Sequence, residues 1–170
     1  MLPASLKNIL QNECLRKMIR KYNEKDKPDL IKLLKLNTPK FFAPLEEKDF
    51  IDYLNNHSES YYVVEESTQI IGAGGLNYGF DKGTTARISW DIIHPNKQGQ
   101  GIGTELIKYR IEEIKKHPHI SKIVVRTTQL VYKFYEKIGF QLEKVENNFW
   151  AKGFDLYEMT IQLNHQPENE

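Results

Sequence analysis

The sequence predicts a mixed α/β (α+β) fold, and three observations support this. The hydrophobic period changes from about 3.6 residues in 27–56 to 2 residues in 61–94. A helical period returns over 103–116, directly after a glycine-rich stretch. A short apolar run at 122–127 and further strand-like segments over 140–163 follow it. The predicted order of elements is therefore β-α-α-β-β-β-α-β-α-β-β.

Composition narrows the class of protein. The 170 residues are 39% hydrophobic and 28% charged, with a net charge of +1, so no strong field draws the chain to nucleic acid or to a membrane. A single cysteine, Cys14, excludes an internal disulfide, and no apolar run approaches the roughly 18 residues of a membrane span. We expect a cytoplasmic protein with one domain over 1–170, including an N-terminal extension (1–16) and a polar tail (164–170).

The N-terminal third is predicted to hold one strand and two helices. Residues 1–16 carry apolar side chains at the spacing of a loose helix, and residues 17–22 alternate like a strand. Residues 27–36 predict a helix with a proline in its first turn. Residues 44–56 predict a second helix, whose acidic side chains come early, where the helix dipole favours them.

The centre of the chain predicts strands. Residues 61–67 and 69–79 alternate with period 2 and are joined near Ser67 and Thr68, which indicates a hairpin. Residues 85–94 predict a third strand, almost wholly apolar near its end.

The helix predicted over 103–116 has one apolar face, made by Leu106, Ile107, Ile111 and Ile114. The run at 122–127 is continuous in apolar residues, as in a strand that is buried on both sides.

The C-terminal part predicts a short helix and a closing hairpin. The helix covers 128–139, with Thr128 as N-cap and Gly139 as the C-terminal glycine. Residues 140–150 and 155–163 form the two strands of the hairpin.

Three glycines, Gly99, Gly101 and Gly103, lie between the strand at 85–94 and the following helix. The first N–H groups of a helix lack internal partners and favour anions, and glycine lets a phosphate approach them. The alternative is a tight strand-to-helix turn without a ligand. The stretch matches neither the G-x-G-x-x-G dinucleotide fingerprint nor the P-loop, so these two kinds of phosphate site are disfavoured.

Two motifs give the chain a resemblance to a known family. Gln98–Gly103 reads Q-x-x-G-x-G, and "VYKFYEKIGF" follows at 131–140. In these motifs and in the order of elements, the chain is similar to the GNAT N-acetyltransferase superfamily. The resemblance implies a mostly antiparallel central sheet with splayed parallel strands, flanked by helices.

The resemblance also implies acetyl-CoA as co-substrate, with its pyrophosphate on the glycine loop. The strand that ends at Ile92–His94 would splay away from 122–127 and pair with the pantetheine arm. A bulge in that strand would point one N–H, that of Ile93, at the thioester carbonyl. Thr128 lies where the family often has asparagine. The implied cofactor-binding residues are Ile92, Ile93, His94, Gln98, Gly99, Gln100, Gly101, Ile102, Gly103, Thr104, Thr128 and Tyr135.

Tyr135 is the predicted general acid for the leaving thiolate. A thiol has a pKa of about 8.5 and a tyrosine of about 10, so the phenol can donate a proton and recover it later. The helix pattern alone equally describes Tyr135 as a core aromatic, and Tyr132, one turn earlier, is a substitute.

Asp91 is the first candidate for the base that frees the amine, because it lies in an otherwise apolar strand. A strand-end aspartate without a catalytic role is the alternative, and Glu65 and Glu66 are weaker candidates. The position four residues before Asp91, a common site of the base in the family, is Arg87. We expect no metal site.

The expected function is N-acetyl transfer from acetyl-CoA to a primary amine of a small molecule or peptide, by direct attack in a ternary complex. An acyl-CoA-binding sensor without turnover and a CoA-independent phosphate-binding domain remain alternatives, and a homodimer is open. The acceptor pocket is expected between the helices within 28–56 and the strand ends near Asn77–Tyr78 and Asn147–Trp150. Its predicted aromatic wall is Tyr61, Tyr62, Tyr78, Phe149 and Trp150.

Overall fold

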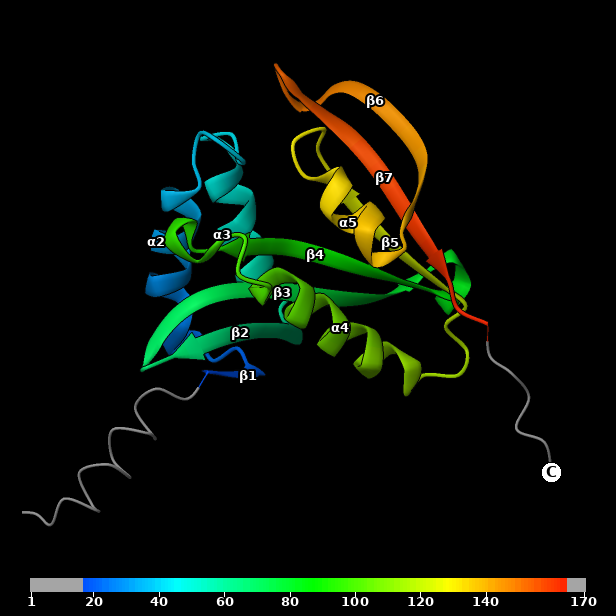
Figure 1. Cartoon of the computed structure of the whole chain (residues 1–170), viewed down its shortest axis with the longest axis horizontal. Helices are drawn as coiled ribbons and strands as arrows, with labels where there is room; N and C mark the ends of the chain where they lie inside the picture. Colours follow the sequence, from blue (N-terminus) through cyan, green and yellow to red (C-terminus); the bar gives the residue numbers. More distant parts are fainter. Residues whose placement is uncertain (1–16, 165–170) are drawn as a thin grey trace, which may run out of the picture.

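The protein is built on a seven-stranded sheet, seen in a computed structural model that describes residues 17–164 (Figure 1). The order of strands is β1-β2-β3-β4-β5-β7-β6, and only β4 and β5 are parallel. The strands are β1 (Lys17–Lys21), β2 (Ser60–Glu66), β3 (Gln69–Phe80), β4 (Thr85–Ile93), β5 (Lys122–Thr127), β6 (Gln141–Ala151) and β7 (Phe154–Gln162). The mixed, mostly antiparallel fold class is confirmed; the helix expected in 1–16 lies outside the described residues.

Within residues 17–164, four α-helices cover the sheet: α2 (Lys27–Leu36), α3 (Glu46–Asn56), α4 (Ile102–Lys115) and α5 (Tyr132–Ile138). Short 3₁₀ turns are η1 (Glu24–Asp26), η2 (Asp81–Gly83) and η3 (Pro95–Lys97). None of the described helices is long and apolar enough to cross a membrane.

Strand β2 shows how the two faces of the sheet are divided. Its side chains alternate: Tyr62 and Val64 join the core under α4 and α5, whereas Tyr61 and Val63 join the core under α2 and α3. Successive side chains of a strand point to opposite faces, so α2 and α3 lie on one face and α4 and α5 on the other. The continuous apolar pattern of β2 reflects burial on both sides.

One predicted boundary is wrong. The helix expected from residue 128 begins at Tyr132, because residues 128–131 form a turn in which the Thr128 carbonyl accepts the N–H groups of Val131 and Tyr132. Thr128 Oγ1 accepts the Leu130 N–H at 3.3 Å and does not cap the helix.

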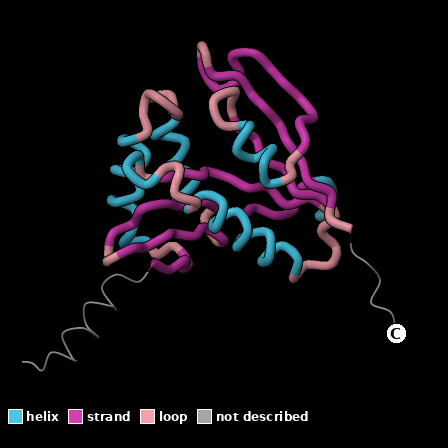
Figure 2. The backbone as a smooth tube through the Cα atoms, viewed as in Figure 1, coloured by secondary structure: helices cyan, strands magenta, loops and turns pink. Residues whose placement is uncertain are grey.

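The parallel strands diverge, as expected. Only Thr85–Ile88 of β4 pair with β5, where their partners are Lys122–Val125. The rest of β4, Ser89–Ile93, runs away from β5. Figure 2 shows that this part of β4 remains with β3, while β5 stays with the β6–β7 hairpin. The divergence leaves an unpaired edge of β4 in the middle of the sheet.

Near the N-terminal edge, Arg20 of β1 holds Asp26 in a two-pronged ion pair, with nitrogen–oxygen distances of 2.8 and 3.0 Å. The hydrogen bond from Arg20 lowers the pKa of Asp26, which is only 7% exposed. We expect Asp26→Asn to lower the free energy of unfolding by about 2 kcal/mol at pH 7, since it removes charged hydrogen bonds. Because the folded pKa is the lower one, this stabilisation exists at neutral pH and disappears as the pH falls below about 4.

The measurement is thermal unfolding of both proteins from pH 3 to pH 7. Asp29→Asn is the matched control, since Asp29 is an exposed aspartate with one lysine partner at 3.3 Å. A difference in Tm between wild type and Asp26→Asn that is the same at pH 3 and pH 7 would contradict the expectation.

Candidate active site

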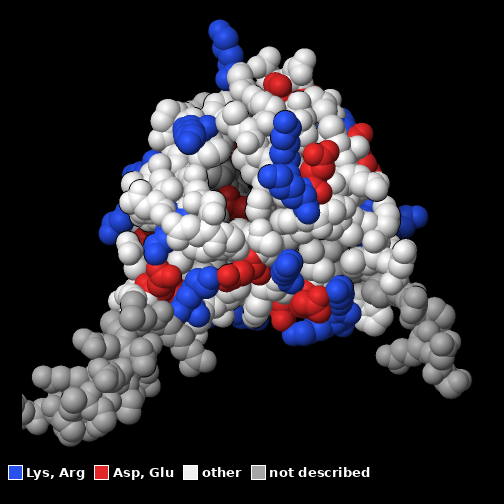
Figure 3. Space-filling model, viewed as in Figure 1, with Lys and Arg blue, Asp and Glu red and all other residues white. Residues whose placement is uncertain are grey.

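A cavity of about 660 Å³ lies where β4 and β5 diverge. Figure 3 shows the hollow in the middle of this face of the molecule. Its lining comes from the end of α2 and start of α3, from β4 and the glycine loop, and from β5, α5 and Trp150. Most of the predicted site residues line it, but His94 and Gln100 do not. Both fold back on Asn96: His94 Nδ1 accepts its N–H, and Gln100 Nε2 donates to its carbonyl.

The glycine loop presents free N–H groups at the start of α4. Gly99 and Gly101 have φ of 73° and 83°, the left-handed region that favours glycine. A Cβ at either position would meet no described atom within 4 Å. No hydrogen bond within 17–164 engages the N–H groups from Gly99 to Thr104; the first α4 bond runs from Glu105 N–H to the Gly101 carbonyl. The loop therefore has the form of an open anion site.

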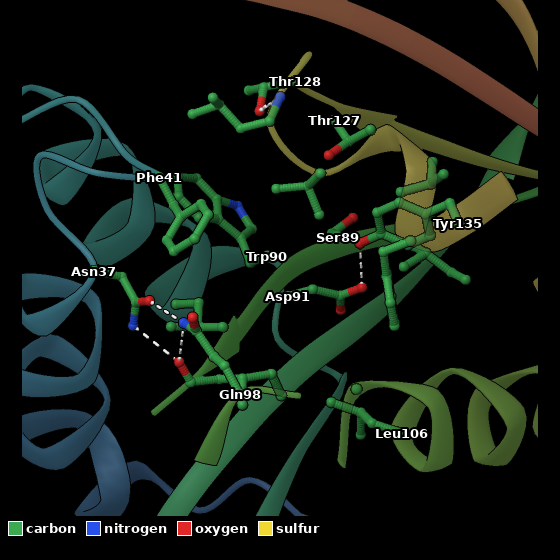
Figure 4. A pocket seen from close by; sticks show the side chains of 18 of the residues that line it. Asn37, Phe41, Ser89, Trp90, Asp91, Gln98, Leu106, Thr127, Thr128 and Tyr135 are labelled. Atoms are coloured by element: carbon green, nitrogen blue, oxygen red, sulfur yellow. Dashed lines mark hydrogen bonds between the residues drawn. The ribbon is translucent and has the colours of Figure 1, made fainter. Parts of the chain in front are cut away.

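The side chain of Gln98 anchors this loop to β4. Gln98 Nε2 donates to the Ile93 carbonyl at 3.1 Å and to Asn37 Oδ1 at 3.0 Å (Figure 4). Asn37, 3% exposed at the end of α2, donates in turn to the Ile93 and Leu33 carbonyls. Sequence reasoning missed Asn37, although an asparagine that directly follows a predicted helix is a candidate cap.

A bulge in β4 changes which way its side chains point. Gly75 faces Ser89 and Ala73 faces Ile92, so Gly74 alone faces both Trp90 and Asp91. Trp90 is the extra residue of the bulge, and its φ is 51°. As a result, Ser89 and Trp90 lie on the α3 face, and Asp91 turns to the α4 face.

After the bulge, the edge of β4 faces the gap. The His94 N–H donates to the Ile71 carbonyl of β3 at 2.8 Å. Because neighbouring residues of a strand direct their backbone groups to opposite edges, the Ile93 N–H points away from β3 and into the gap.

Three charged or polar side chains meet at the floor of the cavity. The Tyr135 hydroxyl donates to Asp91 Oδ2 at 2.5 Å, and Arg110 Nη1 lies 2.6 Å from Asp91 Oδ1 (Figure 4 shows the Asp91 contact). Arg110 also donates to the Gly75 carbonyl at 3.0 Å. Its side chain has no exposed surface, so Asp91 is held against a buried cation. Both oxygens of Asp91 are thus engaged.

Arg110 was missed, although the helix pattern contains it. It lies four residues after Leu106 and four before Ile114, on the apolar face of α4. Gly74 makes room for the ion pair: a Cβ there would lie 2.3 Å from Asp91 Oδ1 and 2.6 Å from Arg110 Nη1.

Tyr135 is both a core aromatic and a site residue. Its ring packs against Phe134 and Phe140, and 3% of the residue is exposed. Burial first, and the neighbouring Asp91 second, raise the pKa of Tyr135 well above its usual value. The phenol is therefore protonated at neutral pH. Tyr132, the substitute candidate, packs against Tyr157 and does not line the cavity.

The aromatic wall differs from the prediction. Of the five expected residues only Trp150 lines the cavity, with its indole N–H on the Thr127 carbonyl at 3.2 Å. Tyr61 and Tyr62 are 1% and 3% exposed inside the two cores. Tyr78 packs against His117, and Phe149 is an exposed neighbour of Trp150. The other wall is instead made by Phe41, Phe42 and Trp90.

The cavity has a second carboxylate, Glu46, at the start of α3. Its Oε2 accepts the Ala43 N–H at 2.6 Å, and burial raises its pKa. The weaker candidate bases lie elsewhere: Glu65 is paired with Arg20, and Glu66 with Lys97. The described residues contain no cluster of three or more His, Cys, Asp or Glu that could hold a metal.

Comparisons with known proteins agree with this architecture. A family model described as "Acetyltransferase (GNAT) domain" matches residues 34–163. A curated relative, "Uncharacterized N-acetyltransferase ycf52" of Pyropia yezoensis, is 37% identical over 73 residues, and the match spans 41% of each chain. It therefore covers less than half of that relative's length.

Solved structures share the fold at low identity. Ard1 from Thermoplasma volcanium has a TM-score of 0.74 at 16% identity, covering 88% of this chain and 99% of that one. An aminoglycoside 6'-N-acetyltransferase in complex with coenzyme A has a TM-score of 0.70 at 18% identity, and the match covers 89% of this chain and 99% of that one. The ribosomal-protein-alanine N-acetyltransferase of Brucella melitensis has a TM-score of 0.69 at 18% identity, and the match covers 86% of this chain and 99% of that one. Since the family model covers most of the sequence, the chain belongs to the GNAT family of acetyltransferases.

Proposed function

We propose that this protein transfers an acetyl group from acetyl-CoA to a primary amine of a small molecule or peptide, by direct attack in a ternary complex. One observation carries the proposal: the unbonded amides of the glycine loop and the Tyr135–Asp91 pair border the same cavity. The coenzyme A complex of the aminoglycoside enzyme, which shares the fold, supports the choice of cofactor.

In this proposal the pyrophosphate binds the N–H groups between Gly99 and Thr104, and the pantetheine arm follows the free edge of β4. The Ile93 N–H, which points into the gap, donates to the thioester carbonyl as it gains negative charge. Gln98 and Asn37 bind the Ile93 carbonyl, which lies in the peptide that follows this N–H, and thereby restrain Ile93 itself.

The reaction forms a C–N bond and breaks a C–S bond. The neutral amine attacks the thioester carbon, the C–S electrons leave on sulfur, and the thiolate takes the proton of the Tyr135 hydroxyl. For this step the hydroxyl turns from Asp91 Oδ2 toward sulfur. Before the reaction Asp91 orients the hydroxyl, and Arg110 balances the carboxylate charge. After the thiol has left, the phenolate recovers a proton from solvent.

The amine must lose one proton to a base. Asp91 is poorly placed for this, because its two oxygens already contact Arg110 and Tyr135. Glu46 lines the cavity with Oε1 unbonded among the described residues, and its raised pKa makes it a better proton acceptor. We therefore assign the amine proton to Glu46, directly or through one water.

We expect Glu46→Gln to lower kcat/KM by about 10²-fold, as is usual for the loss of a general base. Activity of the wild type should fall as the pH drops through the raised pKa of Glu46, because the carboxylate must be ionised to act. In the Glu46→Gln variant, activity should not show this fall at low pH. Glu47→Gln is the control: Glu47 follows Glu46 on α3, pairs with Lys35 of α2 and does not line the cavity. An unaltered pH profile in Glu46→Gln would remove its role.

The proposed function is tested in two steps. Calorimetry with acetyl-CoA, CoA and ATP distinguishes a CoA site from a general phosphate site; binding of ATP equal to that of CoA would contradict the proposal. Release of free thiol is then measured over a panel of amines. Tight acetyl-CoA binding without amine-dependent thiol release would favour a sensor.

A further inference from the structure

We propose that the acceptor amine also carries a carboxylate, which Arg87 and Arg126 bind. This inference rests on the proposed function and specifies its substrate class. A carboxylate on a free amino acid and one on a peptide share this chemistry.

The arginines of the described chain fall into two groups. Arg20 is paired with Asp26 and Glu65, and Arg110 with Asp91. Arg87 and Arg126 line the cavity, as Arg110 does, but no described carboxylate accepts a hydrogen bond from either of them. Within residues 17–164 their terminal nitrogens make no hydrogen bond, and the Nε of each is buried without one. The nearest acid is Glu158, whose Oε2 is 3.5 Å from Arg126 Nε.

The two arginines share one face of the sheet. Arg87 of β4 stands opposite Val124 of β5, and Arg126 is two residues further along β5. Since side chains two residues apart point the same way, both guanidinium groups lie on the α3 face, with Ser89 and Trp90. This is the face opposite Asp91, where an acceptor can approach the gap from the side away from α4.

Aromatic rings hold both guanidinium groups in place. Arg87 Cζ lies 3.9 Å from the centroid of the Phe80 ring. Arg126 Cζ lies 4.7 Å from that of Phe149 and 5.4 Å from that of Trp150. A stacked guanidinium keeps its edge free, and that edge matches a carboxylate with two parallel hydrogen bonds.

The charge of the cavity also favours an acid. Its charged lining residues are Glu46, Arg87, Asp91, Lys97, Arg110 and Arg126. Asp91 neutralises Arg110, and Glu66 neutralises Lys97. Glu158 forms an ion pair with Arg126, so Arg87 is the lining cation that has no ion pair among the described residues. An acceptor without an acidic group would leave Arg87 without a counter-ion.

The position of Arg87 sets the spacing between acid and amine. Arg87 precedes Ile93, whose N–H is proposed to bind the thioester carbonyl, by six positions of β4, and a strand rises about 3.3 Å per residue. The carboxylate is therefore separated from the amine by several bonds, as in an ω-amino acid or in a peptide whose acidic side chain follows its N-terminus.

The test compares acceptors that differ only in the carboxylate. The pairs are 6-aminohexanoate with 6-aminohexanamide, and the dipeptide amides Ser-Glu-NH₂ with Ser-Gln-NH₂, which lack a C-terminal carboxylate, assayed for thiol release with acetyl-CoA. We expect at least a tenfold higher kcat/KM for the acid member of one pair, and the preferred pair identifies free amino acid or peptide. Arg87→Gln and Arg126→Gln should each reduce this ratio at least fivefold, and Lys152→Gln, in an exposed turn, should leave it as in the wild type.

Failure of this inference is distinct from failure of the proposed function. Turnover with equal rates for acid and amide overturns the inference and leaves acetyl transfer intact. If no amine is acetylated, calorimetry of N-acetyl-6-aminohexanoate and its amide with the CoA complex decides. Acid-selective binding that Arg87→Gln abolishes supports the inference, and its absence in the wild type overturns it. Thermal unfolding and the Arg87→Lys variant, expected to retain part of the preference, exclude misfolding as the cause.

Discussion

Replacing Tyr135 by phenylalanine is expected to lower kcat by 10²- to 10⁴-fold, the usual range for a lost general acid. The leaving thiolate loses its proton donor, while the ring that packs on Phe134 and Phe140 is retained. The dissociation constant of acetyl-CoA, measured by calorimetry, should stay within a few-fold, because the loop that binds the pyrophosphate is untouched. Steady-state thiol release measures kcat.

Tyr132→Phe is the matched control, since it removes a hydroxyl from the same helix outside the cavity. Its kcat should equal that of the wild type. Two outcomes would contradict the assignment: a wild-type kcat in Tyr135→Phe, or equal losses in both variants. The second would mean that α5 as a whole, and not the phenol, supports turnover.

Much of the fold could be predicted because local patterns and tertiary burial agree. The period-2 segments around Ser67 and Thr68 became β2 and β3, joined by two residues with φ of 50° and 66°. The run at 122–127 became β5, where Ile123, Val124 and Val125 are buried. The glycine loop followed from helix-end chemistry and needed no long-range information.

The site was harder, because it depends on one bulge. Strict alternation along β4 would place Asp91 on the same face as Ser89 and opposite to Trp90. The extra residue at Trp90 reverses this order, so Asp91 meets Arg110 and Tyr135. The family resemblance implied a bulge in this strand, but no local pattern marks its position, since it arises where β4 leaves β5 while still paired with β3.

The aromatic wall was misplaced for a related reason. Tyr61 and Tyr62 lie in the doubly buried strand β2, so neither side faces solvent. Phe41 and Phe42, which do line the cavity, lie between α2 and α3, where no periodic pattern indicates a direction. Their position depends on how the two helices pack against β4, which only the tertiary structure gives.

The second large effect is expected from Gly101→Ala in the glycine loop. Gly101 precedes α4 with a φ of 83°, and its Cα faces open space. A methyl group there strains the backbone and enters the volume that a phosphate must occupy to reach the free N–H groups. We expect the dissociation constants of acetyl-CoA and CoA to rise at least tenfold in calorimetry, since charged hydrogen bonds of about 1.5–3 kcal/mol each are weakened.

Gly83→Ala separates strain from binding. Gly83 has a φ of 88° and the same open surroundings, but it lies in the turn before β4 and does not line the cavity. Both variants should lose about 1 kcal/mol of stability, because both place an L side chain in the left-handed region. Only Gly101→Ala should lose affinity for CoA. If the two variants bind CoA equally well, the amides of this loop do not hold the pyrophosphate, and the anion site that orients the thioester toward Ile93 and Tyr135 must lie elsewhere.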